Sequence, residues 1–300
     1  MPAFDAALTI GAAVTGALWQ QRVDLELVVV DDGSTDTTAA IVEAIGDPRV
    51  RLLRQDNAGP AAARNHGIAE ASAELIAFCD ADDVLLPGHL NALLEVHERH
   101  GGIVTANAWL LESDGQLTKR RQRHRSRIPV IEDQRLAILQ ENFVSTMSLF
   151  GREMASRLGG FDESLRLAED WDFWIRAILD GSRVSAQPHP LALYNRIGPS
   201  LSTDVAGMDV ATHTVLEKVG ARDDLRPEEA SYVNRRLDGQ SPASHTRTAQ
   251  EDLAAGRWAE AAEGYREAAR LSPRNRPLRL RAAALNAAPR LVGPVLRRRS

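Results

Sequence analysis

The first two thirds of the chain alternate short apolar runs with longer segments of helical periodicity. The apolar runs predict strands at about residues 25–30, 50–53, 75–79, 103–110 and 146–150. The intervening segments predict helices at about residues 6–21, 37–44, 61–71, 87–100 and 132–141. This alternation is typical of an α/β fold, in which helices cover both faces of a mostly parallel sheet.

Carboxylates follow two of the predicted strands. They are Asp31 and Asp32, and then Asp80, Asp82 and Asp83. The carboxyl ends of parallel strands form the ligand-binding edge of such a sheet, so we expect these side chains to converge on one crevice. Taken by itself, the second group also suits an acidic, solvated turn.

Side chains alternate along a strand, so Asp80 and Asp82 are expected to point the same way, with Asp83 on the opposite face as a support. Two adjacent carboxylates repel each other unless a cation lies between them. Mg²⁺ and Mn²⁺ favour such oxygen ligands, usually together with substrate phosphates. We therefore expect Asp80 and Asp82 to hold a divalent cation.

A third acidic group opens a later predicted helix. Glu169, Asp170 and Asp172 lie in its first turn, where negative charge stabilises the positive end of a helix. A carboxylate there can also act as a general base, because an apolar wall raises its pKa while the helix dipole lowers it. Trp171 and Trp174 fit either the core or a stacking contact with a sugar, and the core is favoured for Trp174.

The composition is that of an ordinary globular protein, with 44% hydrophobic and 26% charged residues. The formal net charge of −5 argues against a dedicated nucleic-acid binder. Residues 119–127 are strongly basic and fit a solvated loop or an anion contact. Cys79 is the only cysteine, which excludes an intramolecular disulfide and fits a buried, reduced thiol.

The last third of the chain predicts helices only, which divides the chain into residues 1–205 and 206–300. Within the second part, residues at about 246–273 have the spacing of one tetratricopeptide-like hairpin. Residues 274–300 carry eight arginines and no acids. Their leucines and valines fit a basic amphipathic helix on an anionic membrane, and two prolines fit a solvated tail equally well.

Five motifs occur in an order that resembles the inverting, family-two glycosyltransferases of the GT-A fold. They lie at residues 30–36, 57–67, 80–83, 160–163 and 169–172. The resemblance extends over roughly residues 1–205. It implies a nucleotide-diphospho-sugar donor, a glycan, lipid-linked or protein acceptor, Mn²⁺ or Mg²⁺ as cofactor, and no nucleic acid. It also implies cell-surface glycan assembly in the cytoplasm, either free or peripheral at the inner face of the membrane.

The resemblance implies a role for each matching residue. Asp80 and Asp82 are similar to the two acids of the metal motif, and Asp170 to the general base that deprotonates the acceptor. The residues that it implies in substrate contacts are Pro2, Phe4, Asp31, Asp32, Arg64, Asp80, Glu169, Trp171 and Arg196.

The sequence departs from this family pattern in two places. Family members usually begin with a strand that precedes a Pro-x-aromatic-Asn segment. Here the matching segment, Pro2 to Asp5, directly follows Met1, so we expect that strand to be missing or replaced by another segment. Asn195 interrupts a late segment that often lies near the diphosphate. These departures favour a second interpretation, a catalytically weak nucleotide-sugar-binding or scaffold protein. A nucleotidyltransferase, the third interpretation, would be expected to show a glycine-rich phosphate loop, which the sequence lacks.

Overall fold

The computed structural model describes the chain except residues 113–115, 122–127, 197–204, 240–241, 272–275 and 288–300. It divides into two compact units, Met1–Thr212 and His213–Ser300. Helix α8 (Val205–Gly220) contributes residues to both units. Each unit is described by itself below.

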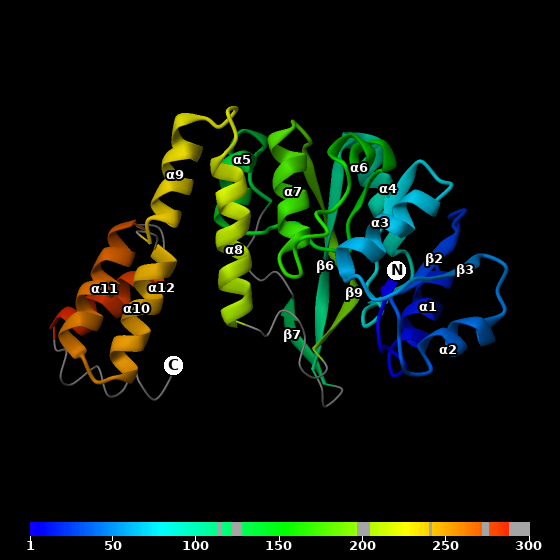
Figure 1. Ribbon diagram of the computed structural model, residues 1–300, viewed down its shortest axis with the longest axis horizontal. Coiled ribbons are helices and arrows are strands. Elements are labelled where there is room, and N and C mark those ends of the chain that lie inside the picture. The colour runs from blue at the N-terminus through cyan, green and yellow to red at the C-terminus, as the bar shows by residue number, and fades with distance from the viewer. Residues whose placement is uncertain (113–115, 122–127, 197–204, 240–241, 272–275, 288–300) are drawn as a thin grey trace. The chain divides into compact units, whose positions relative to one another are not determined.

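A three-stranded parallel sheet with strand order β1-β2-β3 opens the first unit (Figure 1). Its strands and helices are β1 (Pro2–Ala3), α1 (Ile10–Leu18), β2 (Leu27–Asp31), α2 (Thr38–Ile45), β3 (Val50–Arg54) and α3 (Pro60–Glu70). Every residue of β2 is buried, because Val28 and Val30 pack with Ala63 of α3 while Val29 packs in the core that contains α1 and α2. The predicted α/β class, with helices on both faces of a parallel sheet, is confirmed.

The structure places a short strand where the sequence indicated a missing one. In β1, Pro2 pairs with Val30 and Ala3 with Asp31. The backbone N–H of Asp32 donates to the carbonyl oxygen of Ala3 at 2.8 Å. A strand of two residues that includes a proline carries no hydrophobic pattern, which is why the sequence did not indicate it.

A second sheet in the same unit has the order β4-β8-β6-β9-β5, with β7 paired to β6. Among its described strand pairs, only β6 and β9 run parallel, so the predominance of parallel pairing that the sequence predicted holds for the first sheet but not for this one. The elements are β4 (Leu75–Ala77), β5 (Val84–Leu85), α4 (His89–His100), β6 (Ile103–Glu112), β7 (Leu117–Arg121), η1 (Ile131–Asp133), α5 (Gln134–Gln140), β8 (Leu149–Gly151), α6 (Arg152–Leu158), α7 (Glu169–Leu179) and β9 (Val184–Arg196).

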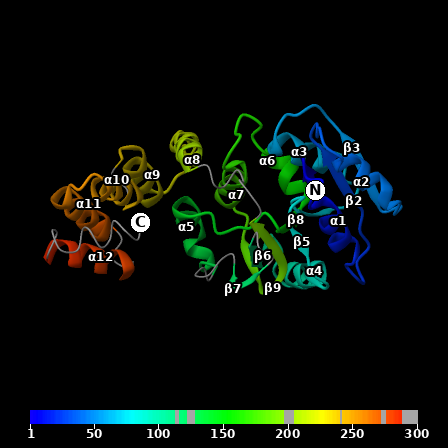
Figure 2. The same ribbon diagram turned by 90° about the horizontal axis from the view of Figure 1, so that it is seen from below.

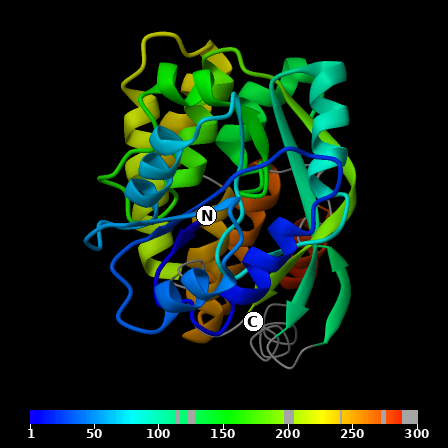
Figure 3. The ribbon, with the colours of Figure 1, turned by 90° about the vertical axis from the view of Figure 1, so that its right-hand side faces the viewer.

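Helices also flank this second sheet. Helix α4 packs on β6 and β9, and α7 lies on the opposite side of β6 in both views (Figures 1 and 2). Figure 3 shows the same unit from the side of α2 and β3. Cys79 is buried in the core with α1 and β2, as the sequence predicted, and burial raises the pKa of its thiol.

The second unit contains α9 (Pro227–Leu237), α10 (Pro242–Ala254), α11 (Trp258–Leu271) and α12 (Arg276–Ala287). Helices α10 and α11 occupy the segment where the sequence predicted a helical hairpin. They approach closely at Gly264, where a Cβ atom would lie 2.9 Å from the Cβ atom of Ala249. Leu278 and Leu285 of α12 are buried in the same core, so they are not free to face a membrane. Residues 288–300 of the basic tail lie outside the described residues.

We expect a buried histidine to make the first unit sensitive to acid. His89 is 1% exposed, its Nδ1 atom lies 3.0 Å from the carbonyl oxygen of Leu191, and burial lowers its pKa to about 4. In the unfolded chain the imidazole of His89 takes up a proton below about pH 6.5, whereas in the folded chain it does so only near pH 4. The free energy of unfolding should therefore fall by about 3 kcal/mol as the pH drops through that window, which means that the protein becomes less stable.

Urea unfolding at pH 7 and pH 4.5 measures this loss. The substitution His89→Gln should remove most of the difference between the two pH values. The substitution His100→Gln, at an exposed residue of the same helix, should leave it unchanged. An equal loss in the wild type and in His89→Gln would contradict the assignment.

Candidate active site

The two acids at the end of β2 hold the loops beside them. One carboxylate oxygen of Asp32 accepts hydrogen bonds from the side chain of Gln55 at 2.8 Å and the N–H of Ala58 at 2.9 Å. Its other oxygen accepts from the N–H of Gly59 at 2.8 Å. Asp31 accepts from the N–H of Ser34 at 3.1 Å. Both acids are buried and therefore fix the loops at this edge of the sheet.

The acidic segment after β4 is a turn and not the end of a strand. Strand β4 ends at Ala77, and the N–H of Asp83 closes the turn by donating to the carbonyl oxygen of Asp80 at 3.1 Å. Strand alternation therefore does not govern Asp80 and Asp82. Both nevertheless retain surface exposure, whereas Asp83 is 1% exposed, in agreement with its expected supporting role.

Asn195 at the end of β9 holds this turn. Its backbone N–H donates to Oδ1 of Asp83 at 3.1 Å, and its side-chain amide donates to the carbonyl oxygen of Asp82. Burial, together with the charges of Asp80 and Asp82, raises the pKa of Asp83 well above its usual value. The residue that interrupts the family pattern is thus the residue that joins β9 to the acidic turn.

Arg64 of α3 joins the acidic turn to the start of α7. It is 6% exposed, and its guanidinium donates to Oε1 of Glu169 at 2.6 Å and to Oδ1 of Asp80 at 3.0 Å. The guanidinium carbon lies 5.9 Å from the ring centre of Phe78 and 5.6 Å from that of Phe161. Burial opposes its charge, but the two carboxylates outweigh this effect and raise its pKa.

Helix α7 begins with an unusual backbone conformation. Ala168, directly before it, has φ 58° and ψ 19°, a left-handed conformation that costs about 1 kcal/mol or more for a residue with a side chain. Glu169 and Asp170 follow at the positive end of the helix. The structure therefore brings Arg64, Asp80 and Glu169 into contact, and Asp170 directly follows Glu169 in the helix.

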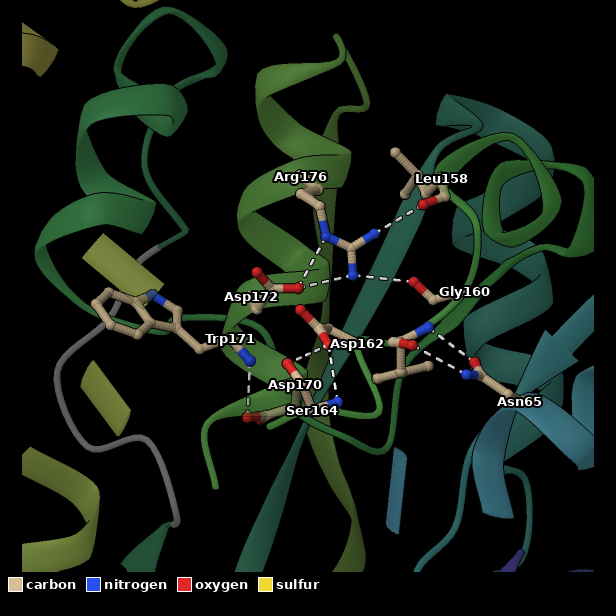
Figure 4. A network of polar contacts seen from close by, with 10 residues as sticks. Asn65, Leu158, Gly160, Asp162, Ser164, Asp170, Trp171, Asp172 and Arg176 are labelled. Atoms are coloured by element: carbon tan, nitrogen blue, oxygen red, sulfur yellow. Dashed lines mark hydrogen bonds and ion pairs between the residues drawn. The ribbon is translucent and has the colours of Figure 1, made fainter. Parts of the chain in front are cut away.

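Both carboxylate oxygens of Asp170 have a hydrogen-bond partner. The N–H of Trp171 donates to Oδ1 at 2.7 Å (Figure 4), and the side chain of Asn142 donates to Oδ2 at 2.9 Å. Burial raises the pKa of Asp170, while the charge of Arg64 and these two hydrogen bonds oppose the rise. Asn142 could not be found from the sequence, because it lies in a loop between α5 and β8 and belongs to none of the motifs.

A network of polar contacts fixes the loop that leads to α7 (Figure 4). Asn65 forms two hydrogen bonds with the backbone of Phe161, at 2.9 and 2.7 Å. Arg176 donates to the carbonyl oxygens of Leu158 and Gly160, each at 2.9 Å. Gly160 has φ 77°, and a Cβ atom there would lie 2.5 Å from Oδ1 of Asn65, so only glycine fits.

The remaining residues predicted in substrate contacts lie in different surroundings. Trp171 is 7% exposed and its indole N–H donates to the carbonyl oxygen of Ile138 at 2.7 Å, while Trp174 is fully buried. Pro2 is half-buried in β1, and Phe4 is 50% exposed. Arg196 ends β9, where its backbone is in register with Glu112, and its side chain lies outside the described part of the chain.

The described residues contain no cluster of three or more histidine, cysteine, aspartate or glutamate side chains that could enclose a metal ion. A site with only two protein carboxylates would need oxygen ligands from a bound substrate. Asp80 and Asp82 fit such a site, because they lie on one turn and each retains exposed surface. Asp83 and Asn195 support that turn from behind.

Comparisons with known proteins agree with this fold. The structure is similar to that of S. aureus TarS in complex with UDP-GlcNAc, with a TM-score of 0.66 and 17% identity, over 91% of this chain and 80% of the TarS chain. It is also similar to the mannosyltransferase PcManGT from Pyrobaculum calidifontis in complex with GDP-Man and Mn²⁺, with a TM-score of 0.59 and 20% identity, over 99% and 85% of the two chains. These likenesses establish a GT-A fold.

Sequence comparison identifies the family. Residues 1–159 match the family described as "Glycosyl transferase family 2", and the chain belongs to it. The succinoglycan biosynthesis protein ExoO of Rhizobium meliloti (strain 1021) is 36% identical over 203 residues, which are 64% of this chain and 58% of ExoO. The chain thus matches little more than half the length of that relative. The predicted family resemblance is confirmed.

Removing the guanidinium of Arg64 should destabilise the protein strongly. The substitution Arg64→Met leaves Glu169 and Asp80 without their partner, and breaking a buried ion pair in this way costs about 3 kcal/mol or more. Urea unfolding measures the cost, and the added substitution Glu169→Gln should restore part of it. Arg54→Met is the matched control, because its ion pair with Glu43 is exposed and should contribute less than about 1 kcal/mol. Equal costs for the two single variants would refute the buried pairing.

Proposed function

We propose that this protein transfers a sugar from a nucleotide-diphosphate donor to an acceptor hydroxyl, with inversion, in the biosynthesis of a cell-surface glycan. The observation that carries the proposal is the ion-pair bridge from Arg64 to Asp80 and Glu169 in a member of glycosyl transferase family 2. This bridge joins the acidic turn to the helix start that carries Asp170. The complexes of TarS with UDP-GlcNAc and of PcManGT with GDP-Man support the donor class.

The donor half of the site consists of the loops at the end of β2 and the acidic turn. Asp31 and Asp32 shape the loops that receive the nucleoside, and Arg64 supplies positive charge beside them. Asp80 and Asp82 would hold Mn²⁺ or Mg²⁺, which neutralises the negative charge that grows on the departing diphosphate. The Mn²⁺ in the PcManGT complex supports this cofactor.

The acceptor half of the site depends on Asp170. Its carboxylate takes the proton of the acceptor hydroxyl while the acceptor oxygen bonds to the anomeric carbon. The bond from that carbon to the diphosphate breaks on the opposite side, so the anomeric configuration inverts. No covalent nucleophile is needed in a direct displacement of this kind. Glu169 would contact the sugar or keep Arg64 in place.

A panel of nucleotide-sugars tests the proposed function. We expect one UDP- or GDP-sugar to be consumed in the presence of Mn²⁺, by transfer or by slow hydrolysis, and EDTA to abolish the reaction. Asp170→Asn should retain nucleotide affinity and lose at least about 100-fold in turnover, in line with the usual contribution of a general base. Asp82→Asn should instead weaken Mn²⁺ binding, measured by the paramagnetic signal of the free ion.

Two results would contradict parts of this proposal, the first the enzyme assignment and the second the role of Asp170. One is donor binding without any turnover in the wild type, which would favour the nucleotide-sugar-binding or scaffold interpretation. The other is full turnover in Asp170→Asn. A variant with Glu141→Gln, which alters the exposed carboxylate directly after the last residue of α5, serves as the control for surface charge.

We further propose that the reaction occurs in the cytoplasm and that the basic tail carries the protein to the inner face of the membrane. No helix in the described part of the chain is long and apolar enough to cross a membrane. In α12, Leu278 and Leu285 are already buried, while Arg279 and Arg281 are exposed. Leu280 is the exposed leucine of this helix, so attraction to anionic lipid would depend on charge more than on insertion of leucines.

Vesicle pelleting tests this membrane contact. Vesicles with anionic lipid should pellet the full chain at low salt, and binding should fall several-fold when salt is raised, because exposed charges are screened. Changing Arg297, Arg298 and Arg299 together to glutamine should also reduce binding, at about 1 kcal/mol for each charge. The control changes the exposed acids Glu260 and Glu263 to glutamine and should not weaken it. Equal pelleting of the arginine variant and the wild type would dismiss the tail as the contact.

A further inference from the structure

Asn142 is fixed between the loop that carries it and the carboxylate of Asp170. Its Oδ1 atom accepts a hydrogen bond from the N–H of Val144 at 3.2 Å, and its Nδ2 atom donates to Oδ2 of Asp170 at 2.9 Å. The bond to Val144 decides which end of the amide faces Asp170. The amide therefore presents its N–H, and not its oxygen, to the carboxylate.

Three charged side chains also act on Asp170, and their effects oppose one another. Arg64 of α3 favours the ionised carboxylate, while Asp80 of the acidic turn and Glu169 of the same helix disfavour it. Arg64 is itself paired with these two acids. Asn142 is a neutral side chain that donates a hydrogen bond directly to Asp170, so its effect does not depend on the pairing of Arg64.

The two donors leave a defined part of the carboxylate free. Each carboxylate oxygen has two lone pairs, and the contacts with Trp171 and Asn142 occupy one on each oxygen. The N–H of Trp171 is the backbone donor of the next residue in the same helix, so by itself it does not fix the rotation of the Asp170 side chain. Asn142 approaches from the loop after α5 and completes a clamp from two separate elements.

We propose that Asn142 is a positioning residue for the general base: its side-chain N–H holds the Asp170 carboxylate in the orientation in which it receives the proton of the acceptor. This proposal rests on the proposed role of Asp170. The proton passes from the acceptor hydroxyl to a free lone pair of Asp170, and Asn142 remains a donor throughout. Its hydrogen bond is stronger to the ionised carboxylate than to the neutral acid, so it also favours the form that can accept the proton.

The pH dependence of turnover tests the proposal. Turnover at saturating donor should fall on the acidic side as Asp170 becomes protonated. In Asn142→Ala, the midpoint of this acidic limb should move up by about one pH unit, because the hydrogen bond to the charged form is lost. Asn142→Asp keeps the shape, removes the donor and adds a charge, so its midpoint should move further in the same direction.

Nucleotide affinity and a matched control separate this role from a structural one. The dissociation constant for the nucleotide diphosphate should stay within about twofold of the wild type in both variants, because the hydrogen bonds described for Asn142 are to Asp170 and Val144. Gln140→Ala, at an exposed residue at the end of α5, should leave both the pH midpoint and turnover unchanged. If Asn142→Ala fails to fold, Asn142→Asp provides the same measurement with a side chain of equal size.

The outcomes distinguish the inference from the function on which it rests. An unshifted acidic limb in both Asn142 variants, with Asp170→Asn inactive, would overturn the inference and leave the base in place. Turnover by Asp170→Asn at the wild-type rate would overturn the proposed base itself. If only donor hydrolysis is detected, the same limb is measured on hydrolysis, because the base then receives a proton from water.

Discussion

The structure of the candidate site depends on one buried cation. Arg64 is almost fully enclosed, yet it carries a charge that two carboxylates and two aromatic rings compensate. An isolated charge in such a place would be very unfavourable, so the chain must bring Asp80 and Glu169 to it whenever it folds. Three segments that are distant in sequence are thereby held together by a single side chain.

The contacts around this bridge make its geometry rigid. Asn65, the next residue of α3, binds the backbone of Phe161, and Arg176 holds the same loop from α7. Helices α3 and α7 therefore both form hydrogen bonds with the loop that ends at Ala168, whose backbone is in the left-handed conformation. A strained backbone of this kind persists only where its surroundings determine it, and it sets the direction in which Glu169 and Asp170 leave the helix start.

Hydrophobic periodicity predicted the elements that bury a face. The predicted range of α1 is several residues longer than the observed helix, whereas strand β2 and helices α2 to α4 were predicted to within two residues of their observed bounds. Strand β1 was not, since two residues make no pattern, and the antiparallel pairing of the second sheet depends on chain reversals that the periodicity of single strands does not record. In the same way, α12 has the pattern of a membrane-surface helix, but Leu278 and Leu285 pack inside the second unit, while Leu280 is exposed.

The chemistry of the site was predictable in type but not in arrangement. Acids at two loop ends and a helix start indicated where charge would gather, whereas the partner of each acid depends on tertiary contacts.

The influences on the pKa of Asp170 show why. From the sequence, the helix dipole is expected to lower the pKa of Asp170 and burial to raise it, and the sequence does not show which effect is larger. In the structure burial is the larger influence and raises the pKa of Asp170. Arg64, the N–H of Trp171 and the amide of Asn142 limit that rise, because each favours the ionised form. A carboxylate whose pKa is raised in this way is a stronger proton acceptor than an exposed aspartate. No single residue type in the motif could have supplied that balance, because it requires a loop residue outside every motif.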